Sequence, residues 1–359
     1  MSILKKIMIS GHTMTGKTMV ALALAAKIKS EGKSISYFKP IGRKSFELST
    51  DSEDIDDDAF LMKHSLGLQY DITTICPIAR SRSTYEDLID NGKGDFLDRI
   101  EKSYQELSES ADVLIIEGTM YPWNLLHIDL SSPQIAKHLD ASVLCLVNFT
   151  TVESIDEIFL MKELFSAYGV EFVGFILSKV PPILTSYVKT KVIPFLKNQG
   201  FSVCGVIDDR PELFSPNIRE ILKALDGQMI SGEDKMDLLI DKFMVGSMAP
   251  ENALKYFRRA GDKAVITSGD RCDICQAALE TDTNLLILTG GMGPDIRTIA
   301  RAKELGVPIM MTAFDTYSTS QIVDKLEGDV RPDDKSRLKL IEEIINKSID
   351  FDCFLKKAP

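Results

Sequence analysis

Residues 11–18 of the chain read Gly11-His12-Thr13-Met14-Thr15-Gly16-Lys17-Thr18. This stretch fits the pattern G-x-x-x-x-G-K-[ST] and lies between an apolar run that predicts a strand and a segment, Met19 to Ser30, that predicts a helix. The glycines of such a loop let the backbone wrap around phosphates, and successive amides and the helix N-terminus point at the negative charge. The stretch therefore predicts a site for a nucleoside triphosphate with Mg²⁺; a chance glycine-rich turn is the alternative. We expect six residues to line the nucleotide: Gly11, Met14, Thr15, Gly16, Lys17 and Thr18.

Lys17 and Thr18 have the most specific expected roles in this loop. The lysine reaches the outer phosphates, so we expect Lys17 to be catalytic as well as nucleotide-binding. The hydroxyl of Thr18 is an expected ligand of magnesium.

Short apolar runs alternate with segments of helical period over the first two hundred residues. Most of the runs are continuous, which is typical of parallel strands covered by helices on both faces. The predicted strands are Ile7 to Ser10, Ile35 to Phe38, Val113 to Glu117, Val143 to Asn148, Phe172 to Leu177 and Val203 to Ile207. The pattern predicts an α/β fold with a doubly wound, mostly parallel sheet.

A second, smaller α/β region is predicted after Arg210-Pro211. Its predicted strands are Ala264 to Thr267, Leu285 to Thr289 and Pro308 to Thr312, and its predicted helices are Ile218 to Leu225, Ile274 to Glu280, Ile296 to Leu305 and Ser320 to Leu326. We expect three parts: a nucleotide-binding domain over residues 1–210, a second domain over 216–328, and a C-terminal helix and tail over 329–359. The spacing of Leu338, Ile341, Ile344 and Ile345 is helical, and we expect this helix to dock on the second domain.

Two charged residues stand at the ends of predicted strands, where ligands of open α/β folds bind. Lys39 follows the second strand; if that strand neighbours the first, the ammonium faces the phosphates and neutralises a transferring phosphoryl group or holds an anionic substrate. A solvated lysine at a strand end is the alternative. Glu117 ends an apolar run, where an acidic residue linked to magnesium belongs.

An acidic stretch precedes the predicted helix Ala59 to Leu66. Its members are Asp54, Asp56, Asp57 and Asp58. Carboxylates complement the dipole of a helix N-terminus, so a solvated helix start is the alternative reading for most of them. Asp58, which lies nearest the helix, is the member that we expect to reach the metal.

Composition and charge exclude several classes of function. The 359 residues are 44% hydrophobic and 26% charged, without an apolar run of membrane-spanning length, so we expect no membrane partner. A net charge of −11 repels phosphate backbones, and we expect no nucleic acid partner. The six scattered cysteines suit buried thiols in a reducing compartment, so we expect a cytoplasmic protein.

Two weaker motifs lie in the second region. Cys272 and Cys275 have the spacing of half a zinc site, but no second pair of ligands follows, and we reject a structural zinc. The glycine-rich segment from Gly290 to Pro294 seats an anion on a helix N-terminus or is a tight turn that merely needs glycine.

Together these residues resemble dethiobiotin synthetase and the N-terminal domain of long phosphate acetyltransferases. The resemblance covers about residues 1–210 and rests on the phosphate loop, Tyr37-Phe38-Lys39-Pro40, Asp58-Ala59 and Ile115-Ile116-Glu117-Gly118. The second region resembles the DRTGG domain that follows in the same acetyltransferases, through Val245-Gly246-Ser247-Met248, Tyr256-Phe257-Arg258-Arg259, Gly269-Asp270-Arg271 and Leu288-Thr289-Gly290-Gly291. The two regions account for most of the 359 residues and leave no room for the acetyl-transfer domain, so we do not expect acetyl transfer.

The resemblance implies that ATP and Mg²⁺ are the cofactors. Lys17, Lys39 and Glu117 would be catalytic, and Thr18, Asp58 and Glu117 would hold the metal. The asparagine that reads adenine in the synthetase corresponds here to Ser178, which is the one further residue that we expect to bind the nucleotide. The proline after the last strand is replaced by Asp208, and the loop is one residue shorter.

Two functions remain open from the sequence. One is ATP-dependent activation of a carboxylate or carbamate, with a small anionic metabolite as substrate and a regulatory second domain. The other is a nucleotide-sensing regulatory protein without turnover. We expect a homo-oligomer in either case.

Overall fold

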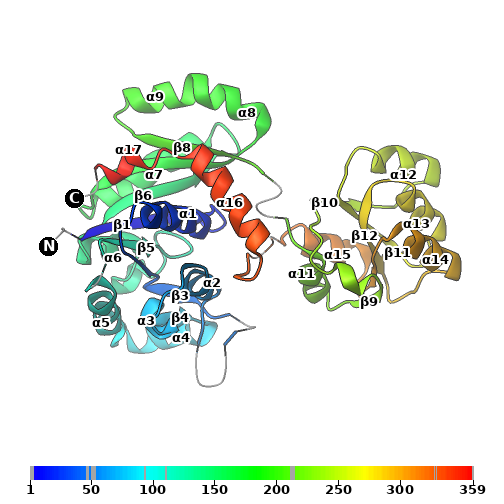
Figure 1. Ribbon diagram of the computed structural model, residues 1–359, viewed down its shortest axis with the longest axis horizontal. Helices are drawn as coiled ribbons and strands as arrows, with labels where there is room; N and C mark the ends of the chain where they lie inside the picture. Colours follow the sequence, from blue (N-terminus) through cyan, green and yellow to red (C-terminus); the bar gives the residue numbers. More distant parts are fainter. Residues whose placement is uncertain are drawn as a thin grey trace. The chain divides into compact units, whose positions relative to one another are not determined.

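The computed structural model describes residues 4–45, 48–49, 54–92, 94–109, 111–210, 215–326, 328 and 330–357. The chain forms two compact units (Figure 1). The first comprises Met1–Asp209 together with Val330–Pro359, and the second is Arg210–Asp329.

The first unit contains a sheet of six parallel strands in the order β2-β5-β1-β6-β7-β8. The strands are β1 (Lys5–Gly11), β2 (Ile35–Phe38), β5 (Val113–Glu117), β6 (Ser142–Asn148), β7 (Phe172–Val180) and β8 (Val203–Asp208). From β1 the chain passes to β2 at one edge, inserts β5 between these two strands, and then crosses to β6 on the other side of β1, so the direction of the strand order reverses at β1. The loop that follows β1 therefore lies at the switch point of the sheet, and the predicted α/β fold with a mostly parallel sheet is confirmed.

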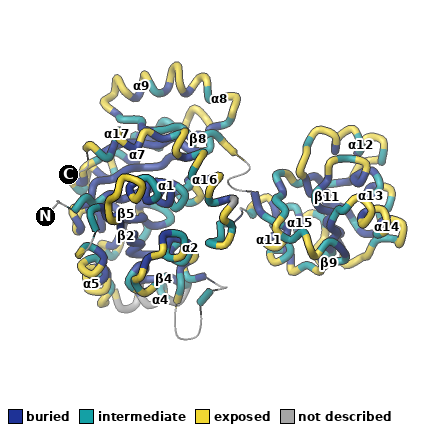
Figure 2. Tube along the Cα trace, in the orientation of Figure 1, coloured by how far each residue is buried: buried dark blue, intermediate teal, exposed yellow. Residues whose placement is uncertain are grey.

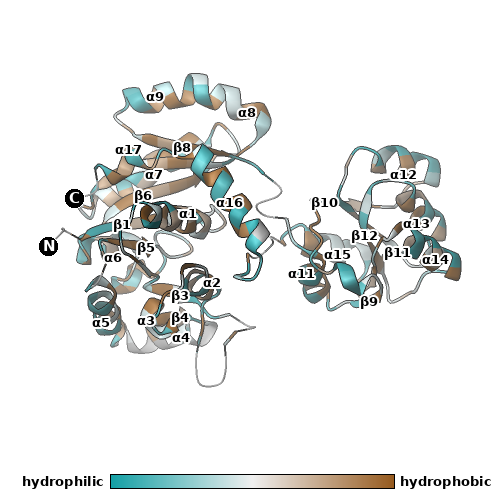
Figure 3. Cartoon of the chain, in the orientation of Figure 1, coloured by the Kyte–Doolittle hydropathy of each residue, from teal (hydrophilic) through white to brown (hydrophobic). Residues whose placement is uncertain are grey.

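Helices cover the faces of this sheet because its strands are apolar on both sides. Ile7, Met8 and Ile9 in β1 are at most 1% exposed, and Figures 2 and 3 show the central strands as buried and hydrophobic. The helices are α1 (Lys17–Ser30), α2 (Asp57–Leu66), α3 (Ile72–Ile75), α4 (Arg82–Asn91), α5 (Phe96–Ser108), α6 (Ser132–His138), α7 (Ser154–Ser166), α8 (Pro182–Tyr187) and α9 (Ile193–Asn198). A separate parallel pair, β3 (Ile41–Arg43) and β4 (Ile78–Arg80), lies between β2 and α4 in the chain.

The C-terminal segment belongs to the first unit, so the expectation that it docks on the second is wrong. It contains α16 (Lys335–Ser348) and α17 (Asp352–Leu355), and α16 packs against α1 and β8 (Figure 1). Ile341 and Ile345 are the buried face of α16, as their spacing indicates. Ile349 bridges to Gly205 at the edge of the sheet. Helical spacing identifies an apolar face but does not identify the surface that covers it.

A disulfide between Cys204 of β8 and Cys353 of α17 joins this segment to the sheet. The expectation of reduced, buried thiols is therefore wrong for this pair. The two residues are 149 positions apart in the sequence, and their Cα atoms lie 5.5 Å apart only because α16 returns the chain to β8.

The second unit contains a five-stranded sheet in the order β10-β11-β12-β13-β9, in which only β9 is antiparallel. Its strands are β9 (Gln228–Ser231), β10 (Lys242–Val245), β11 (Lys263–Ser268), β12 (Thr283–Thr289) and β13 (Ile309–Met311). Its helices are α11 (Ile218–Ala224), α12 (Pro250–Phe257), α13 (Cys272–Leu279), α14 (Ile296–Leu305) and α15 (Thr316–Val323). The short strands β9 and β10 were not among the predicted elements. Within the described residues, no helix is long and apolar enough to cross a membrane.

Candidate functional site

The loop between β1 and α1 has a backbone that requires glycine. Gly11 has φ 150°, and a Cβ atom there would lie 2.3 Å from the carbonyl oxygen of Leu146 on β6. Gly16 and Met14 have φ values of 86° and 59°, so the chain turns sharply just before α1. The Thr15 hydroxyl, which is buried, donates to the carbonyl of His12 at 2.9 Å. The loop is therefore a tight, internally braced turn that leads into a helix N-terminus.

Lys17 lies inside this loop. Its Nζ donates to the carbonyl oxygens of His12 at 2.7 Å and Gly11 at 3.3 Å. Burial lowers the pKa of Lys17 to about 8, although the nearby carboxylate of Glu117 acts in the opposite direction. The ammonium is thus held among loop backbone atoms and is costly to bury, so an anion within the loop would stabilise its charged form.

Glu117, Lys39 and Thr18 meet at the carboxyl edge of the sheet. Lys39 Nζ lies 3.3 Å from Oε1 of Glu117, and the Thr18 hydroxyl donates to the same oxygen at 3.1 Å. The other oxygen of Glu117 accepts from the hydroxyl of Tyr37 at 2.9 Å. The sequence-based condition that the second strand neighbours the first is wrong, because β5 lies between β1 and β2. It is β5 that carries Glu117 and so joins Lys39 to the loop.

Two aspartates complete the surroundings of Lys39. Nζ forms an ion pair with Asp58 and lies 3.2 Å from Oδ1 of Asp56. Asp56 is buried, caps α2 by accepting from the amide of Ala59 at 2.9 Å, and accepts from the amide of Arg43 at 2.7 Å. For Asp56 the reading as a solvated helix start is therefore wrong. Sequence reasoning missed its contact with Lys39 because its helix-capping pattern gives no sign of a lysine across the sheet edge.

The electrostatics of this cluster follow from burial and pairing. Burial alone would lower the pKa of Lys39, but Asp56, Asp58 and Glu117 raise it well above its usual value. Burial raises the pKa of Glu117, and Lys39 partly offsets this. Burial also acts to raise the pKa of Asp58, but pairing with Lys39 outweighs it and lowers that pKa. Lys39 therefore stays charged.

The oxygen atoms near Thr18 suit a divalent cation that takes its remaining ligands from a bound nucleotide and water. Thr18, Asp58 and Glu117 offer one hydroxyl and two carboxylates, the oxygen donors that Mg²⁺ combines with phosphate oxygens and water. No group of three or more His, Cys, Asp or Glu side chains in the described parts of the chain is arranged to hold a metal by itself. A magnesium ion here would therefore depend on phosphate oxygens for part of its coordination.

Ser178 lies at the carboxyl end of β7, on the opposite side of β6 from the loop. Its hydroxyl is buried and donates to the side-chain oxygen of Asn148, on β6, at 3.0 Å. Asn148 is a polar residue at the sheet edge that sequence reasoning did not single out.

His12 is a second residue that sequence reasoning missed. Its Nδ1 lies 3.3 Å from Oε1 of Glu157 on α7, and its ring contacts Tyr121 and Trp123 edge-on at centroid distances of 5.6 and 5.0 Å. Nothing local in the sequence connects residue 12 with residues 121–157, because the contacts depend on the order of the strands.

The glycine-rich segment of the second unit behaves as a turn. The amides of Gly290 and Gly291 donate to the carbonyls of Phe314 and Thr312, at 2.8 and 2.9 Å. The N-terminus of α14 is capped by Asp295, whose carboxylate accepts from the amide of Thr298 at 2.8 Å. Three amides that could bind an anion, those of Gly290, Gly291 and Thr298, are thus already engaged by the protein, which favours the tight turn over the anion seat.

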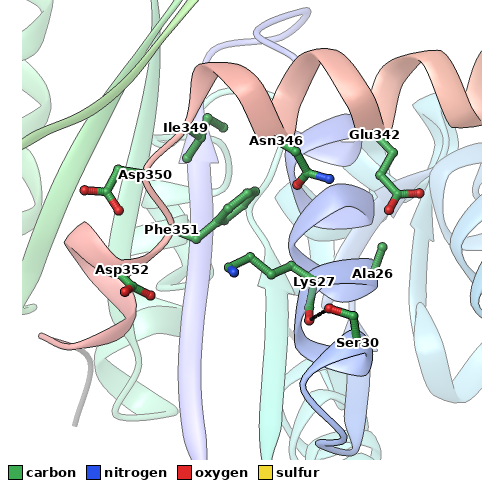
Figure 4. A pocket seen from close by; sticks show the side chains of 9 residues that line it. All are labelled: Ala26, Lys27, Ser30, Glu342, Asn346, Ile349, Asp350, Phe351 and Asp352. Atoms are coloured by element: carbon green, nitrogen blue, oxygen red, sulfur yellow. Dashed lines mark hydrogen bonds between the residues drawn. The ribbon is translucent and has the colours of Figure 1, made fainter.

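A cavity of about 430 Å³ lies against α1 but away from the phosphate-loop end of that helix (Figure 4). It is lined by Lys27 and Ser30 near the end of α1 and by Glu342 and Asn346 on α16. Phe351 forms part of its wall beneath the turn into α17. Its mixed charges and exposed rim are those of a groove between two packed helices.

These features define a P-loop nucleotide-binding protein of the α/β class. The chain belongs to the AAA domain family, which matches residues 5–217. The DRTGG domain family matches residues 220–326.

Curated relatives are similar to nearly the whole length of this chain. The phosphate acetyltransferase of Nitratidesulfovibrio vulgaris is 26% identical over 94% of this chain and 49% of its own length, and that of Pseudomonas putida is 24% identical over 93% and 49%. The chain thus spans about half the length of these relatives. A solved structure of the CBS and DRTGG domains of Clostridium perfringens pyrophosphatase, complexed with diadenosine tetraphosphate, is 20% identical over 38% of this chain and 69% of that one, with a TM-score of 0.29.

Proposed function

We propose that the first unit binds Mg-ATP and transfers its terminal phosphoryl group to a carboxylate or carbamate. The observation that carries this proposal is the meeting of Lys17, Thr18 and Glu117 at the point where the sheet reverses its strand order. In the proposed complex the loop amides and Lys17 bind the outer phosphates. Thr18, Asp58 and Glu117 hold magnesium, which neutralises charge on the phosphate oxygens.

Lys39 has a distinct role in this proposal. It is 6% exposed and remains protonated because three carboxylates surround it. Asp58 and Glu117 would interact less with Lys39 if they held magnesium, and the ammonium of Lys39 would then hold the anionic acceptor beside the phosphoryl group.

A second function is favoured by the same contacts. The charge of Lys39 is already balanced by Asp56, Asp58 and Glu117, which supports a site that binds nucleotide without an acceptor. In this version the nucleotide is a signal, and the DRTGG unit carries the response.

One titration tests both functions. Purified protein is titrated with ATP, GTP or ADP, with and without Mg²⁺, and the heat of binding is measured. Phosphate release is then followed in the presence of candidate acceptors, which are carboxylates and, as sources of carbamates, amines with bicarbonate. We expect Mg-ATP to bind, and Lys17→Ala to weaken binding about 100-fold, because the loop loses its charge on the outer phosphates.

The matched control is Lys33→Ala, which removes an exposed lysine that pairs only with Glu31 among the described contacts. Binding with acceptor-stimulated phosphate release supports phosphoryl transfer. Binding without any release above that of Lys17→Ala supports the sensor, and no binding of any nucleotide contradicts both.

A further inference from the structure

A side-chain contact connects the phosphate loop to α7. His12 follows the first glycine of the loop, and its Nδ1 lies 3.3 Å from Oε1 of Glu157. On another side the imidazole meets the edges of Tyr121 and Trp123. Those two rings are stacked on each other at 5.6 Å with an interplanar angle of 21°. The His12 ring is thus clamped between a helix and an aromatic wall.

The wall itself is held rigidly by the segment that follows β5. The amide of Tyr121 donates to the side-chain oxygen of Asn124 at 2.8 Å, and Thr119 donates to the carbonyl of Tyr121 at 2.7 Å. The amide of Ser132 reaches back to the carbonyl of Pro122 at 3.0 Å. This segment is braced at three points and so gives the His12 ring a fixed wall, while Glu157 contacts the same ring at Nδ1.

The backbone of His12 is also the point on which the loop's own side chains converge. Its carbonyl accepts from Lys17 Nζ at 2.7 Å and from the hydroxyl of Thr15 at 2.9 Å. Any shift of His12 therefore moves the acceptor that holds the phosphate-binding ammonium. The Nε2 atom of His12 and the Oε1 atom of Glu157 are both buried and, among the described residues, neither has a hydrogen-bond partner. The carboxyl group and the ring therefore meet at 3.3 Å as a packing contact, beside the aromatic contacts of the ring.

We propose that Glu157, acting through His12, is a positioning residue of the phosphate loop, and that the charge on its carboxyl group weakens the binding of a triphosphate. This inference rests on the proposed nucleotide site and adds regulation of that site by pH. A protonated carboxyl packs against His12 without adding negative charge near the loop. An ionised carboxylate at the same place repels phosphate.

The surroundings of Glu157 bring the pKa of its carboxyl group close to neutral pH. Burial raises the pKa of Glu157 to about 7. Burial and then the charge of Lys17 lower the pKa of His12, so the imidazole is neutral when Glu157 titrates. The thiol of Cys145 on β6 stays protonated, because burial and the charge of Glu157 raise its pKa well above the usual value. Tyr121 faces the ring from the segment after β5.

A natural fluorophore lies close enough to report the titration of Glu157. Trp123 is the only tryptophan in the sequence, and its ring lies 5.0 Å from that of His12. Tryptophan fluorescence of the protein alone is therefore followed between about pH 5.5 and 8.5. We expect an inflection near pH 7 in the wild type that is absent in Glu157→Gln, whose side chain keeps its shape but has no proton to lose. A wild-type curve without that inflection overturns the inference and needs no variant.

The second measurement is the Mg-ATP dissociation constant at about pH 6 and pH 8 by calorimetry. We expect the wild type to lose about three- to tenfold more affinity over this interval than Glu157→Gln. Glu163→Gln, an exposed residue on the same helix, is the control and should keep the wild-type profile. Binding with equal pH dependence in wild type and Glu157→Gln overturns the inference alone. No Mg-ATP binding at any pH overturns the proposed function and the inference with it.

Discussion

The carboxyl edges of the two sheets are built alike but differ in what they leave for a ligand. At the first, Lys17 and Lys39 are buried and face carboxylates that belong to other elements. At the second, the amides of Gly290, Gly291 and Thr298 already donate within the protein, and the pair Arg271–Asp273 is exposed. The difference teaches that two similar sheet edges can hold their charges in different ways. At the first edge the charges are buried and paired between elements distant in the chain, and at the second they are exposed and paired within one short segment.

The largest expected effect comes from breaking the buried charge cluster. Replacing Lys39 with methionine leaves Asp56 and Glu117 buried without their cation, which we expect to lower the free energy of unfolding by about 3–5 kcal/mol. Urea denaturation of the whole protein, with the two units followed separately by hydrogen exchange, measures the loss.

The counterpart in the second unit is Arg271→Met, which removes an exposed ion pair with Asp273. Surface pairs contribute little, so we expect no resolvable change in the second unit's unfolding. Equal losses from both substitutions would mean that the two edges do not differ in the way described.

A smaller effect is expected in hydrogen exchange with saturating Mg-ATP. The amides of residues 12–18 should exchange about 100-fold more slowly at a nucleotide concentration of about 100 times the dissociation constant. Residues 290–296 should not change, because the amides of Gly290 and Gly291 already donate within the protein. Protection at residues 290–296 instead would restore the anion seat and reverse the comparison.

The smallest effect concerns the pH dependence of stability. Folding raises the pKa of Glu157 from 4.5 to about 7, so the folded state holds this proton more tightly than the unfolded state. The contribution of Glu157 to the free energy of unfolding is therefore fully present below pH 4.5, falls as the pH rises toward 7, and does not return above 7. Since the side chain is 22% exposed, we expect a loss of about 1–2 kcal/mol.

Denaturation of the wild type and of Glu157→Gln at matched pH values isolates the contribution of Glu157 to the free energy of unfolding. The difference between the two proteins should change across the interval and level off above pH 7. A difference that is the same at every pH would show that Glu157 does not titrate in the folded protein.

The sequence predicted much of the site because its signals are local. The pattern of residues 11–18 gave the loop, and the charged residues that end or follow apolar runs gave Lys39 and Glu117. It predicted less about their neighbours. Asp56 was read as part of a solvated helix start, and Glu157 was not singled out at all, because their contacts join elements that are distant in the chain.

By itself the sequence determined the six strands of the first sheet, three strands of the second sheet and the phosphate loop, since continuous apolar runs and glycine positions act within a few residues. Only the tertiary structure decided the strand order that inserts β5 between β1 and β2 and so joins Lys39 to Glu117. It also decided that α16 returns to the first unit and brings Cys353 to Cys204. The physical reason is that burial and pairing are properties of surfaces in contact, and one segment's periodicity does not encode which surface will cover it.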